Sequence, residues 1–153
     1  MAKSTTRDDA DTELQAMIDK HGWAVVGVAP TTPGGGVPFA YTVGLTAQKL
    51  PELALYGLGD ATNSAVILNT VAQQMVDGAV LHGGERVTGV LAGDLELAVI
   101  DMGDTSDLTA VRRFYGDVPA ARQLIWPDPE GRMPWEGWGC SDASQPISNW
   151  PPF

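Results

Sequence analysis

Three of the chain's five tryptophans stand in one segment broken by proline and glycine, QLIWPDPEGRMPWEGWGC at residues 123–140. Trp126 and Trp135 can bury their indole rings and so hold an irregular segment on the core. They can also line a cleft, with Gln123 and Asp128 as its polar groups. We favour the structural interpretation, but both stay open, because a segment held on a core is a good place for a binding site.

A second candidate group lies in the stretch PFAYTVGL and the LPELALYGL run that follows it. Alternation along a strand sends Tyr41 to one face and Thr42 to the other. Gly44 indicates a bulge or a close approach by another backbone or a ligand. Glu52 would lie beside Thr42 if the two strands pair. These residues fit either a cleft that faces the tryptophan-rich segment or a plain hairpin with a polar edge.

Acid–base chemistry requires a titratable side chain, and Glu52, Asp128 and His82 are the candidates. The two histidines, His21 and His82, are far apart and belong to no metal-binding motif, so no metal site is predicted. Cys140 has no local cation or helix N-terminus that would activate its thiol. An acid–base enzyme is therefore an alternative to a binding module.

The composition restricts the class of protein. With 19 acidic and 9 basic residues the net charge is −10, which argues against nucleic-acid and anionic-membrane partners. A single cysteine excludes an internal disulfide and fits a reducing compartment. There is no apolar signal segment and no run of about 18 apolar residues that would span a membrane. We expect a soluble, cytoplasmic protein with a small-molecule or protein partner and no required cofactor.

Hydrophobic periodicity then gives the elements that position these residues. A helix is expected over about 11–20, after a disordered tail at 1–10. The expected order is helix, three strands, helix, two or three strands, a short helix and a last strand that ends at Pro127. Residues 11–153 are therefore predicted to form one α+β domain with a mainly antiparallel sheet and two or three helices. An open sheet and a small barrel both fit this order.

The motifs HGW, YTVGL and PEL, followed by Q, WPD, G and PW, occur in this order from residue 21 to about 146. In this pattern the chain resembles a bacterial family known as domain of unknown function 4262. The resemblance implies a single domain and a bacterial or phage setting, and it implies no activity.

Three hypotheses follow. The first is a ligand- or protein-binding module with a cleft between the YTVGL strand and the tryptophan-rich segment. The second is a small acid–base enzyme. The third is a flavin-binding protein, because a compact barrel with these early motifs is similar to split-barrel flavin reductases at the level of fold. The few lysines and arginines argue against the third, since they leave few groups for a flavin phosphate.

Overall fold

A computed structural model describes residues 7–28, 38–57, 61–91, 93, 95–102, 105, 107–127 and 130–131. Its six strands form one sheet in the order β1-β2-β3-β6-β5-β4. They are, in chain order, β1 (Ala24–Val28), β2 (Phe39–Val43), β3 (Glu52–Tyr56), β4 (Arg86–Val87), β5 (Leu97–Asp101) and β6 (Ala121–Ile125). All neighbours pair antiparallel except β3 and β6, which pair in parallel.

The predicted α+β class, with a mainly antiparallel sheet, is confirmed. Within the described residues the sheet is open, with β1 and β4 at its edges, and no barrel forms. Three helices accompany the sheet: α1 (Arg7–His21), α2 (Ala61–Val76) and α3 (Thr109–Tyr115). None of them, in the part of the chain that the structure describes, has the length and hydropathy needed to cross a membrane.

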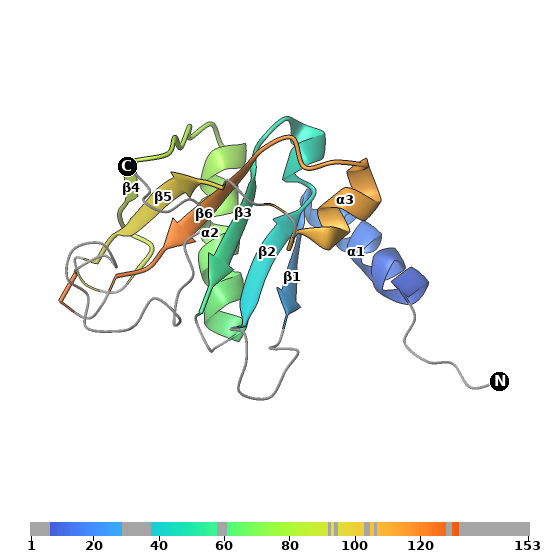
Figure 1. Ribbon diagram of the computed structural model, residues 1–153, viewed down its shortest axis with the longest axis horizontal. Coiled ribbons are helices and arrows are strands. Elements are labelled where there is room, and N and C mark those ends of the chain that lie inside the picture. The colour runs from blue at the N-terminus through green and yellow to red at the C-terminus, as the bar shows by residue number, and fades with distance from the viewer. Residues whose placement is uncertain are drawn as a thin grey trace.

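The helices cover the two faces of the sheet, and each face has its own apolar core. Leu68, Val71 and Met75 of α2 pack with Leu53 and Leu55 of β3 on one face. On the other face, side chains of α1 and α3 pack with Tyr41 and Val43 of β2 and with Ala54 of β3. Figure 1 shows α1 and α3 next to each other and α2 running along the sheet. The alternation expected for β2 is confirmed. Ala40 packs in the core on the α2 face, whereas Tyr41 and Val43 pack in the core on the opposite face.

Helix boundaries differ from the sequence prediction at their N-terminal ends. α1 begins at Arg7, a few residues before the start expected at about residue 11. It ends as predicted, because Gly22 has a φ of 96° and its N–H donates to the Ile18 carbonyl. α2 begins at Ala61, although the sequence suggests a start capped by Asn63 or Ser64. α3 begins after Leu108 without a side-chain cap.

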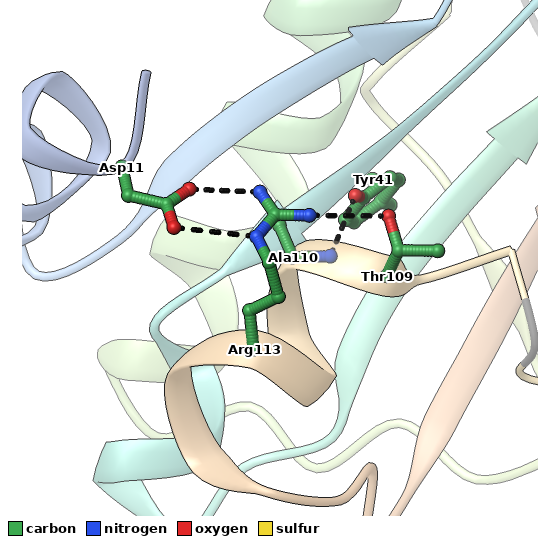
Figure 2. Close-up of polar contacts among 5 residues, drawn as sticks. All are labelled: Asp11, Tyr41, Thr109, Ala110 and Arg113. Atoms are coloured by element: carbon green, nitrogen blue, oxygen red, sulfur yellow. Dashed lines mark hydrogen bonds and ion pairs between the residues drawn. The ribbon is translucent and has the colours of Figure 1, made fainter. Parts of the chain in front are cut away.

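Two polar contacts hold α1 and α3 to each other and to the sheet (Figure 2). Arg113 contacts both carboxylate oxygens of Asp11, with Nη2–Oδ1 at 2.8 Å and Nε–Oδ2 at 3.3 Å. The hydrogen bond with Asp11 raises the pKa of Arg113 above its ordinary value. The Ala110 N–H donates to the hydroxyl oxygen of the buried Tyr41, at 3.1 Å. Tyr41 therefore connects β2 to the first turn of α3.

Candidate functional site

Glu52 and Thr42 lie side by side, as expected from pairing of their strands. The Thr42 hydroxyl donates to Glu52 Oε1 at 2.8 Å, and it accepts the N–H of Leu53 at 2.9 Å. Both Thr42 and Glu52 are completely buried. A side-chain hydrogen bond thus joins the C-terminal end of β2 to the first residue of β3.

Four further donors surround the Glu52 carboxylate. The backbone N–H groups of Gly44, Leu45 and Thr46 donate to it at 3.1, 3.3 and 3.0 Å. The Thr46 hydroxyl donates at 2.7 Å. Two carboxylate oxygens offer about four lone pairs, so five donors leave no capacity for another group. Glu52 fastens the start of the short 3₁₀ helix η1 (Leu45–Gln48) to β3.

Gly44 makes the close backbone approach that its position in the sequence indicates. Its φ is 124°, and a Cβ at this residue would lie 2.8 Å from both the Gly22 carbonyl oxygen and Trp23 Cα. The Gln48 side chain also donates to the Gly22 carbonyl, at 2.9 Å. The segment from Gly44 to Gln48 therefore packs against the junction between α1 and β1.

Trp126 lies at the opposite end of β3 from Glu52. Its indole N–H donates to the backbone carbonyl of Tyr56, the last residue of β3, at 2.7 Å, and its half-buried ring packs against the α2 core. Four residue steps of about 3.3 Å, or about 13 Å, separate this end of the strand from Glu52. Asp128 and Trp135 lie outside the described residues. A cleft between the two segments therefore stays a prediction.

Two further candidate residues, Gln123 and His82, belong to β6 and to the turn before β4. Gln123 is completely buried in β6, opposite Ala54 of β3. His82 is exposed on a turn before β4, where its backbone N–H donates to Glu85 Oε1 at 3.1 Å. The structure thus brings Thr42, Gly44 and Glu52 together. Among the described residues, no group of three or more His, Cys, Asp or Glu side chains could hold a metal ion.

One titratable group responds to the buried carboxylate. Burial raises the pKa of the Tyr115 hydroxyl above its ordinary value of 10.0, and the negative charge of Glu52 adds to this shift. Tyr115 belongs to α3, on the face of the sheet opposite α2. The charge of Glu52 therefore adds to the effect of burial at one hydroxyl of α3.

Sequence reasoning missed a pocket between α1, β1 and α2. Its volume is about 410 Å³, and it is lined by Met17, His21, Trp23, Ala24, Val25, Ala65, Asn69 and Gln73. The lining combines an indole, a thioether and small apolar side chains with two amides. Trp23 stands in the HGW motif and its indole was the available signal, but the sequence does not show that α2 comes beside it.

The two amides of the pocket are each partly used within the protein. The Trp23 indole N–H donates to Asn69 Oδ1 at 2.8 Å, and the Gln73 amide nitrogen donates to Asp77 Oδ1 at 2.9 Å. The Asn69 amide nitrogen and the Gln73 carbonyl oxygen have no hydrogen bond to any described residue. The pocket thus carries a donor and an acceptor that a bound molecule can use.

A family model described as "Domain of unknown function (DUF4262)" matches residues 17–139. The matched range includes both the Glu52 cluster and the described residues that line the pocket. No curated protein and no solved structure matches the chain.

Proposed function

The chain belongs to the DUF4262 family, whose description names no activity, and we propose that it is a ligand-binding module with its site in the pocket between α1, β1 and α2. The observation that carries the proposal is the pocket itself. About 410 Å³ lies within the volumes typical of small-molecule sites, which combine apolar walls with a few placed polar groups.

The chemistry of the walls selects the ligand. Trp23, Met17 and Val25 offer apolar surface, and the amides of Asn69 and Gln73 offer one donor and one acceptor. Among the described residues of the lining, His21 is the one titratable side chain. An uncharged ligand that combines an apolar group with an amide fits this lining better than an anion, which the net charge of −10 repels.

The Glu52 cluster supports the proposal, because it holds the pocket in shape. Glu52 fixes Gly44, Gly44 packs against Trp23, and the indole of Trp23 is oriented by Asn69. A site whose walls are fixed before binding loses less conformational entropy when a ligand enters. In this proposal Glu52 is a positioning residue and does not contact the ligand.

Acid–base catalysis by Glu52 is less well supported than binding. A general base must reach a proton of the substrate, and the Glu52 carboxylate is buried and already accepts five hydrogen bonds. His82 lies on an exposed turn before β4, where its backbone N–H donates to Glu85, and Asp128 is outside the described residues. The flavin alternative also stays a prediction, with no contact among the described residues in its favour.

The test is a titration with benzamide, followed in ¹H–¹⁵N NMR spectra. The expected result is a saturable shift of the Trp23 indole N–H and of the Asn69 and Gln73 side-chain amides. Benzoate, which has the same ring and a carboxylate, should bind more weakly. The proposal is wrong if benzamide causes no saturable shift at Trp23, or if the shifts concentrate at Trp126 instead.

A matched pair of variants gives the control. Gln73 and Gln15 are both exposed, and each donates to an aspartate four residues later, Asp77 and Asp19 respectively. Gln73→Glu places a charge at the pocket and should weaken benzamide binding at least about fivefold, or roughly 1 kcal/mol. Gln15→Glu adds the same charge elsewhere and should leave binding unchanged. Equal weakening by both variants would contradict a site at the pocket.

A further inference from the structure

The outer face of α2 is free of charge. The sixteen residues Ala61–Val76 include no Asp, Glu, Lys or Arg, although 18% of the chain is charged. α1, in contrast, has the sequence RDDADTELQAMIDKH, in which almost every second residue is charged. The exposed side chains of α2 are polar but neutral, or apolar: Thr62, Asn63, Val66, Asn69, Gln73 and Val76.

Such a face is unusual for a helix in contact with water. The outer stripe of a surface helix normally carries charged side chains, whereas the centre of a protein interface is depleted of them. Val66 is 57% exposed at the middle of the stripe, and Met17 of α1, beside the pocket, is 47% exposed. At 1.5 Å per residue the neutral stripe is about 24 Å long. It has the composition of an interface and the length of a helix–helix contact.

We propose that this face binds a second copy of the same chain, by antiparallel packing of α2 on α2 about a two-fold axis. Two molecules that each carry a net charge of −10 repel each other, and the repulsion is least where neutral surfaces meet. Asn69 keeps a donor and Gln73 keeps an acceptor with no bond to a described residue, so two copies of this face can bond to each other. A two-fold interface requires this property.

The stripe and the pocket overlap in part. Asn69 and Gln73 belong to the stripe and also line the pocket, whereas Val66 belongs to the stripe and does not line the pocket. Val66 is therefore the position at which the interface can be changed without changing the pocket. A stripe about 24 Å long and about 10 Å wide is smaller than the roughly 800 Å² per partner of a standard interface. The dimer is accordingly weak, with a dissociation constant on the order of 100 µM.

The test is sedimentation equilibrium of the full chain from about 5 µM to about 1 mM in roughly 0.15 M salt, where charge repulsion is partly screened. The wild-type protein should show a mass that rises toward that of a dimer. Val66→Glu and Val66→Lys should both remain monomeric, because either charge would be buried without a partner. Circular dichroism should show that both variants keep the fold, since Val66 is exposed.

Comparison of Val66→Glu with Val66→Lys distinguishes an interface at α2 from a general effect of net charge on association. If only the overall charge matters, Val66→Lys should associate more strongly than the wild type and Val66→Glu less strongly. That pattern would overturn the proposal, as would a wild-type protein that stays monomeric over the whole range. Because Val66 does not line the pocket, a benzamide titration of Val66→Glu reports on the ligand site alone, so the two proposals fail separately.

Discussion

The Glu52 cluster and the α1–β1–α2 pocket are adjacent, yet their polar groups are used in opposite ways. In the cluster, one buried carboxylate accepts five hydrogen bonds, four from the connection between β2 and β3 and one from Thr42 of β2. In the pocket, the amides of Asn69 and Gln73 each keep one group without a bond to the described residues.

The difference separates a structural polar group from one that can recognise a ligand. A buried polar group stabilises a fold only when its hydrogen bonds are satisfied within the protein. A group that recognises a ligand must keep capacity for it. On this criterion Glu52, the most prominent acid–base candidate of the sequence, belongs to the framework, and the less conspicuous Asn69 and Gln73 belong to the site.

Removal of the carboxylate should give the largest effect. Glu52→Ala leaves two hydroxyls and three backbone N–H groups without their acceptor, and it should lower the free energy of unfolding by roughly 4 kcal/mol. Chemical denaturation of the purified protein measures this. Glu13→Ala, which removes an exposed carboxylate of α1, should change the stability by less than about 0.5 kcal/mol. A similar loss in both variants would contradict a structural role for Glu52.

Gly44→Ala should have the next largest effect. The new Cβ would stand 2.8 Å from Gly22 and Trp23 atoms at a φ of 124°, so strain and overlap together should cost roughly 2–4 kcal/mol. Gly78 has a similar φ of 114°, but a Cβ there would meet nothing within 4 Å. Gly78→Ala should therefore cost only about 1 kcal/mol. Thermal unfolding of the two variants separates crowding from backbone strain, and equal losses would argue against close packing at Gly44.

Arg113→Ala tests a polar contact at the surface. The pair with Asp11 joins α1 to α3, but both side chains are more than a quarter exposed, so the loss should be about 0.5–1 kcal/mol and smaller in 1 M salt. Arg112→Ala, on the same helix, removes a contact of 3.3 Å with Thr105 and should cost less. A loss as large as that of Glu52→Ala would show that α1 depends on this pair for its docking.

The smallest predicted effect is on alkaline stability. Because the pKa of Tyr115 is raised in the folded state, the folded protein holds this proton more tightly than the unfolded chain. The stability that it contributes is complete below pH 10 and is lost as the pH rises through the folded pKa. Tyr115→Phe should therefore show a shallower loss of unfolding free energy above pH 10. Parallel pH profiles for the two proteins would contradict the shift.

Most of the framework was predictable from local patterns. The order of helices and strands, the β1–β2 hairpin and the Thr42–Glu52 contact follow from apolar periodicity and strand alternation. The parallel pairing of β3 with β6 did not, because it joins segments almost seventy residues apart. The helix starts at Arg7 and Ala61 were also missed, although Thr6 and Asp60, whose residue types often cap helices, directly precede them in the sequence.

The candidate site was predictable only in part. Gly44 and Glu52 were recognised as important residues, but their saturated hydrogen bonding depends on how the chain turns after Val43. The pocket requires Trp23 and Asn69, 46 positions apart, to meet across the edge of the sheet. No local pattern encodes that meeting, because it results from the docking of α2 on β1 and β2.

Native-state hydrogen exchange tests the central claim, that the Glu52 cluster is a fixed part of the framework, most directly. The Thr46 N–H donates to Glu52 and the His82 N–H donates to Glu85, at nearly equal distances of 3.0 and 3.1 Å. The second contact lies on an exposed turn. The amides of Gly44, Leu45 and Thr46 should exchange only through global unfolding, and the His82 amide should exchange orders of magnitude faster. Exchange of the Thr46 amide as fast as that of His82 would contradict the account.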